Sequence, residues 1–202
     1  GIWAFTKLFL KDKSMRGAFV QASFRSSAAV MGLAFIDNIY GSSVMGPLMI
    51  IGAVPLYNIY SVIVLTFEGT QEEGEKDTSK IDKTLANVAK LATPLALVAM
   101  GAGFKGKEAL AKMKPTLVAA FIKLIGQTAI FIPIAAKMGF TGEKIIAILI
   151  MLAAPTTPSC YIMAKNMHND GDLTASIVVM TTLLAAFTLT GWIFILKTLG
   201  LI

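Results

Sequence analysis

The stretch IIAILIMLAAPTTPSCYIMA, residues 145–164, decides the fold. It is uncharged and mostly apolar, and about 20 such residues are enough to cross the hydrocarbon of a bilayer. Pro155 and Pro158 stand near its middle, where each removes an amide donor and crowds the preceding turn. Backbone freed at that depth is tolerated only against protein or a water-filled cavity. The stretch therefore predicts a transmembrane helix that is interrupted inside a larger bundle, with a simple proline kink as the alternative.

Other apolar stretches of spanning length lie on both sides of this one. They are 17–39, 44–67, 84–104, 115–136 and 173–196, with a shorter one at 1–10. The chain is 55% hydrophobic and 15% charged, whereas a soluble domain carries about 25% charged residues. We therefore predict an all-α, polytopic transmembrane protein that spans the cell membrane several times, with the lipid bilayer as its solvent.

The net charge of +6 is concentrated in short loops between the apolar stretches, as in cytoplasmic loops of membrane proteins. That placement argues against a nucleic-acid partner. Cys160 and His168 are each the single residue of their type. We therefore expect no disulfide framework and no transition-metal site.

A weak internal repeat appears when the chain is shifted against itself by 129 residues. Residues 25–29 then meet 154–158, and the turn at 37–41 meets 166–170. Identities are few, so the match lies in hydropathy and turn placement. Such self-similarity is typical of transporters that bind substrate at the interface of two repeats. Coincidence between two helical hairpins is the alternative.

The two repeated segments contain the first candidate binding residues. Around the prolines, Thr156, Thr157 and Ser159 supply hydroxyls where a half-helix would begin, and a helix N-terminus attracts anions. The partner segment, 23–32, holds small and polar residues together with Arg25. A charge at that depth is costly, so Arg25 is expected either to meet an anion or to snorkel towards the basic loop.

Three further polar side chains lie inside apolar stretches. Lys123 is too deep to snorkel easily, and we expect it to pair with substrate or to replace a coupling cation. Asn58 and Gln127 are predicted to be buried amides, at the substrate or bonded to a neighbouring helix. The candidate substrate-binding residues are Arg25, Ser26, Ser27, Gly32, Asn58, Lys123, Gln127, Pro155, Thr156, Thr157, Pro158 and Ser159.

At these residues the chain resembles the auxin efflux carrier family, within the bile/arsenite/riboflavin transporter superfamily. The resemblance runs along nearly the whole chain. Its most specific pieces are FRSSAAVMGL (24–33), PLYN (55–58), LATPLAL (91–97), and APTTP (154–158) followed by Ala-Lys at 164–165. Together these pieces are fairly specific, whereas each alone is weak.

The resemblance implies ten helices in two inverted five-helix repeats, the fourth helix of each being broken. The breaks would cross at the substrate site, with 25–32 as the first crossover and 154–159 as the second. It further implies alternating-access transport of a small carboxylate, such as a dicarboxylate or an auxin-like acid. A coupling H+ or Na+ and a homodimer are also expected, with no other cofactor. Ser27 departs from the Asn that is common in the family, and Ala34 from the Pro of plant members.

Against that pattern the chain is expected to be truncated at its N-terminus and to lack one internal helix. Residues 1–68 would be the C-terminal part of the first repeat, 69–83 a polar cytoplasmic linker, and 84–202 the second repeat without its first helix. With 84–104 as a single span, the basic loop 105–114 would lie opposite the basic loop 11–16. The chain is therefore predicted to be a secondary carrier of a small organic anion or, alternatively, a transport-inactive fragment of one.

A membrane-embedded enzyme is not expected. Intramembrane hydrolysis or group transfer would need paired carboxylates, histidine ligands or a serine beside a base. Asp37 is the single carboxylate inside a candidate span, and it lies close to the end of that span.

Overall fold

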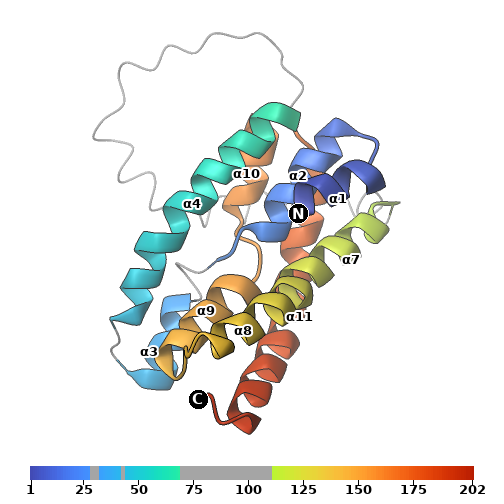
Figure 1. Ribbon diagram of the computed structural model, residues 1–202. Coiled ribbons are helices and arrows are strands. Elements are labelled where there is room, and N and C mark those ends of the chain that lie inside the picture. Colours follow the sequence, from blue (N-terminus) through green and yellow to red (C-terminus); the bar gives the residue numbers. More distant parts are fainter. Residues whose placement is uncertain (28–31, 42–43, 69–110) are drawn as a thin grey trace, which may run out of the picture.

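The computed structural model describes residues 1–27, 32–41, 44–68 and 111–202, and over these ranges the chain is a bundle of helices without strands (Figure 1). Three helices within this part are long and apolar enough to cross a membrane. They are α4 (Met45–Glu68), the continuous helix Met113–Lys137, and α11 (Gly171–Thr198). The all-α prediction is therefore confirmed for the described residues.

Two helices of the bundle are interrupted. α2 (Lys13–Phe24) is followed by α3 (Leu33–Tyr40), and α9 (Glu143–Ala153) is followed by α10 (Ser159–Asn166). α9 ends because Ala154 precedes a proline, which disfavours the α conformation, and Ala154 is indeed extended (φ −66°, ψ 148°). Arg25 is extended in the same way after α2 (φ −71°, ψ 135°). The interruption predicted at Pro155 and Pro158 is confirmed.

A third spanning helix changes its winding instead of breaking. α7 (Met113–Phe121) passes through a π-helical segment, η2 (Ile122–Gly126), into α8 (Gln127–Lys137). Within this segment the carbonyl of Leu124 accepts a hydrogen bond from Trp192 Nε1 at 3.1 Å. π-helical turns are rare and often occur at functional sites, because they turn side chains away from the regular helical spacing.

The half-helices cross in the middle of the bundle. α2 packs against α10 on one side of the crossing and α3 packs against α9 on the other (Figure 1). The centre is filled by α9, whose Ile145, Ile146, Leu149 and Ile150 are at most 1% exposed. The outward faces of the long helices are apolar too, as expected for a surface that meets lipid: Phe187 on α11 and Ile51 on α4 are largely exposed.

The order of elements agrees with the internal repeat. A half-helix, an interruption, a second half-helix and a long helix occur twice, as α2–α3–α4 and as α9–α10–α11. α2 ends at Phe24 and α9 ends at Ala153, an offset of 129 residues. The inverted five-helix form of the repeat stays a prediction.

One end of the bundle gathers charged residues. α1 (Ile2–Phe9) brings Trp3 to this end, where its Nε1 donates to buried Glu68 at 2.7 Å, and Arg16 lies 3.6 Å from the same carboxylate. Lys112 pairs with Asp170 at 2.7 Å, and the amide of Asp170 donates to the carbonyl of Ser14.

The start of α7 therefore lies at the same end as the start of α2. For residues 111–114, the described part of the basic loop 105–114, this differs from the expectation that the loop would lie opposite the loop 11–16, because Asp170 ties Lys112 to the α2 end. The predicted linker 69–83, the span 84–104 and the piece at 91–97 lie outside the described residues.

Candidate functional site

The two interruptions are in direct contact. The backbone amide of Ser27 donates to the carbonyl of Pro155 at 2.8 Å. Both Ser27 and Thr156 are almost completely buried, with 8% and 1% of their surface exposed. The structure therefore brings together the two segments that the sequence predicted to meet.

Each interruption caps the other. The last carbonyls of a helix have no partner inside it, and lipid cannot supply one. Thr156 Oγ1 donates to the carbonyl of Ala22 at the end of α2 at 2.7 Å. Ser26 Oγ donates at 3.3 Å to the carbonyl of Ile150 at the end of α9, which also accepts the backbone amide of Ala154. Tyr57 Oη, from α4, donates to the carbonyl of Met151 at 3.0 Å.

Lys123 joins both helix ends. The π-helical segment places its side chain in the core, where it is fully buried. Its Nζ donates to the carbonyl of Leu152 at 2.9 Å and to the carbonyl of Phe24 at 3.4 Å. The side chain is therefore held at the crossing, on the side of the two C-terminal ends.

Arg25 lies at the crossing beside α4 and α10. Its Nη2 donates to Asn58 Oδ1 at 2.7 Å, and its Nη1 lies 2.7 Å from Met163 Sδ and 3.4 Å from Ser61 Oγ. Only 8% of Arg25 is exposed, so the snorkelling alternative is wrong. These acceptors are all neutral, and they use at most three of the five N–H donors of a guanidinium.

A small cavity opens between Arg25 and the start of α10. Its volume is about 150 Å³, and it is lined by Arg25, Ser26, Ser27, Val54, Tyr57, Asn58, Thr157 and Ser159. The first turn of α10 carries no acidic side chain, so the positive end of its dipole is not neutralised there. The cavity offers hydroxyls, N–H donors and positive potential, which is the chemistry that binds an anion.

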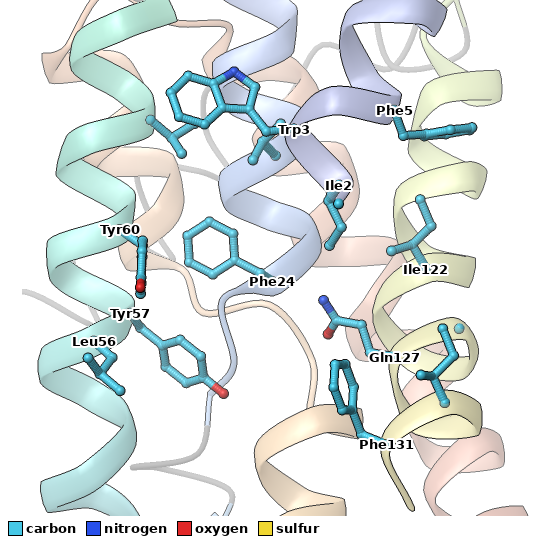
Figure 2. A pocket seen from close by; sticks show the side chains of 15 residues that line it. Ile2, Trp3, Phe5, Phe24, Leu56, Tyr57, Tyr60, Ile122, Gln127 and Phe131 are labelled. Carbon is cyan, nitrogen blue, oxygen red and sulfur yellow. The ribbon is translucent and has the colours of Figure 1, made fainter. Parts of the chain in front are cut away.

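A larger groove runs beside this cavity. Its volume is about 990 Å³, and it lies between α1, α2, α4 and the α7–η2–α8 helix. Figure 2 shows that aromatic side chains, among them Phe24, Tyr57 and Phe131, project into it. Gln127 is half-buried and lines this groove, not the small cavity, so the structure separates it from the other candidates.

One of the remaining candidate residues, Asn58, has a different setting from the one predicted. Asn58 is exposed at the surface of α4 instead of buried, although its side-chain oxygen turns inwards to Arg25. Gly32 is buried at the start of α3. Pro155 is buried and Pro158 is half-buried within the interruption, and the amide of Thr156 donates to Thr181 Oγ1.

Besides Val54, which lines the cavity, sequence reasoning missed three residues that make hydrogen bonds at the site. Tyr57 stands beside Asn58 in the PLYN piece, and Ser61 follows one turn later on the same helix, so their positions carried a signal. Nothing in the sequence marked Met163, because a methionine in an apolar stretch normally serves only to pack against its neighbours.

Comparison with known proteins gives one family. The family described as membrane transport protein matches residues 79–193, which is more than half of the chain and includes Lys123 and the second interruption. No curated protein and no solved structure matches the chain.

Proposed function

Because the chain belongs to the membrane transport protein family, that of the auxin efflux carriers, we propose that it is a secondary carrier of a small organic anion. The anion binds in the small cavity at the junction of the interrupted helices and is exposed to each side of the membrane in turn. Coupling to H+ or Na+, a homodimeric state and a place in the plasma membrane belong to the same proposal.

The guanidinium of Arg25 is the observation that carries this proposal. A buried cation is costly unless a charge compensates it, and the acceptors around Arg25 are neutral. The contacts with described residues leave at least two of its N–H donors for a ligand. An anion in the cavity would supply the missing charge and accept these donors.

The size of the cavity narrows the substrate class. At about 150 Å³ it is well below the roughly 300–1,000 Å³ of sites for drug-sized ligands. This favours a short carboxylate, such as a dicarboxylate, over an indole-sized acid. The hydroxyls of Thr157 and Ser159, 3.1 Å apart, would bind a carboxylate at the start of α10.

Counterflow of labelled malate in proteoliposomes tests the proposal. Arg25→Gln should lower uptake about tenfold or more, because a charge-assisted hydrogen bond contributes about 1.5–3 kcal/mol. Lys137→Gln removes an exposed cation far from the cavity and should leave uptake unchanged. Unchanged uptake in Arg25→Gln would show that Arg25 does not bind the substrate and would contradict the proposed site. If the wild-type protein inserts but takes up no organic anion, the transport-inactive alternative would be supported.

A further inference from the structure

The C-terminal ends of α2 and α9 meet at the side chain of Lys123. Its Nζ lies 2.9 Å from the carbonyl of Leu152 and 3.4 Å from the carbonyl of Phe24, and no part of the residue is exposed. The neighbouring carbonyls of the same turns, those of Ala22 and Ile150, accept hydrogen bonds from neutral hydroxyls. Within the described part of the crossing, the two ends therefore share one cationic partner.

A cation is the expected occupant of such a place. The C-terminal end of a helix carries about half a negative charge, and two ends that face one point add their potentials. In transporters with interrupted helices, half-helix ends and freed carbonyls of this kind coordinate the coupling Na+. An ammonium group has the same charge and directs its N–H donors at the same carbonyls.

We propose that Lys123 is a positioning residue that acts as a tethered cation. It holds the ends of α2 and α9 together and takes the place that a free alkali ion would occupy at this crossing. The π-helical segment Ile122–Gly126 turns the side chain to this point. One consequence is that no Na+ binds here during transport, and this consequence rests on the proposed carrier function. The contact of Lys123 with the two helix ends does not depend on that function.

Thermal unfolding of the full chain in detergent tests the proposal without transport. Melting temperatures are compared in choline, sodium and methylammonium chloride at one ionic strength. The wild type should melt at the same temperature in all three salts. Lys123→Ala leaves an empty space between the carbonyls and should melt about 5–10 °C lower in choline, with much of this loss regained in sodium or methylammonium.

Two further variants separate charge from packing. Lys123→Met fills the space without a charge and should be destabilised equally in every salt. Thr156→Val removes a neutral cap of the same crossing and should also show no salt effect. If Lys123→Ala gives no folded protein in choline, folded protein should be recovered when it is prepared in methylammonium. Failure of that recovery, or equal behaviour of the Ala and Met variants, would overturn the proposal.

Transport adds an independent measurement. If Lys123 takes the place of Na+, H+ is the coupling ion left for the proposed carrier. Malate counterflow by the wild type should then run at the same rate in sodium and in choline, and a requirement for sodium would contradict the tethered cation. If the wild type moves no malate at all, the proposed carrier function fails. The melting temperatures would still decide the role of Lys123.

Discussion

At the scale of single residues, Arg25 and Lys123 show two ways of holding a cation inside a bundle. The guanidinium of Arg25 is a planar fork that reaches three neutral side chains and has further donors beyond these contacts with described residues. The amine of Lys123 is compact and points at two backbone carbonyls. The first arrangement suits a ligand that comes and goes, and the second suits a permanent contact.

The planar shape of the Arg25 guanidinium leads to a first prediction, which concerns the KM for malate. Lys at position 25 keeps the charge but cannot reach Asn58, Ser61 and Met163 together. Arg25→Lys should therefore raise the KM for malate about three- to tenfold, with a smaller loss than in Arg25→Gln. The measurement is uptake against malate concentration in proteoliposomes, with Lys137→Arg as control. A KM equal to that of the wild type would show that only the charge matters.

Gly17 makes a second prediction at this scale. An added methyl group would overlap Asn169 Oδ1 and would lie 3.2 Å from Glu68 Cβ. Asn169 would have to move, and its Nδ2 would lose the bonds to the carbonyls of Leu65 and Met167. Gly17→Ala should lower the free energy of unfolding by about 1–3 kcal/mol, measured by thermal unfolding.

Gly52 provides the matched control for that change. It lies in the middle of α4 with open space around it. Alanine favours a helix by up to about 1 kcal/mol over glycine, so Gly52→Ala should be neutral or stabilising. Equal stability of the two variants would mean that Asn169 can move away from position 17 without loss, which would contradict the prediction.

At the scale of elements, the second interruption was predictable and the first was much less so. Pro155 and Pro158 break a helix by local chemistry, which any sequence shows directly. α2 ends at Phe24 without a proline, and its last carbonyls are capped by Thr156 and Lys123 from distant parts of the chain. Only small and polar residues, and the family resemblance, marked that position in the sequence.

The π-helical segment could not have been predicted. Residues 122–126 lie in a stretch that is otherwise typical of an apolar α-helix. One contact of the wider turn comes from Trp192 of α11, whose indole N–H donates to the carbonyl of Leu124. The sequence identified Lys123 as a deeply placed charge, but it could not show which way the side chain points. The sequence therefore left open whether Lys123 meets substrate or replaces a cation, and the proposal of a tethered cation rests on its two carbonyl contacts.

Reciprocal capping makes a prediction for the crossing. Thr156→Val keeps the shape of the side chain but leaves the carbonyl of Ala22 without its donor. The free energy of unfolding should fall by about 1–3 kcal/mol, because a buried polar group is left unsatisfied. Thr190→Val removes a bond within α11 at an exposed position and should change stability little. Equal melting temperatures for both variants and the wild type would show that the cap is unimportant.

At the scale of the whole molecule, the electrostatic potential of the half-helix ends differs between the two sides of the crossing. α10 begins beside Arg25 and the small cavity, whereas α2 and α9 end at Lys123. The half-helices thus direct positive potential to one place and negative potential to another. The proposed anion and the proposed tethered cation are complementary to these two potentials.

The ends of the bundle give the last prediction. Lys112 is tied through Asp170 to Ser14, so the starts of α7 and α2 share one end. The helix Met113–Lys137 has 25 residues, and at 1.5 Å each its length of about 37 Å exceeds the hydrocarbon thickness of roughly 30 Å. Lys137 must then lie at the opposite end.

Single cysteines placed in a Cys160→Ala background can test this arrangement with a membrane-impermeant maleimide. Lys13, Lys114 and Lys137 are all exposed, so each accepts a cysteine without loss of a buried contact. Since basic loops remain in the cytoplasm, Lys137→Cys should react in intact cells, and Lys13→Cys and Lys114→Cys only after lysis. Labelling of Lys13→Cys and Lys114→Cys from opposite sides would mean that the ends of α2 and α7 do not meet in the membrane as they do in this bundle.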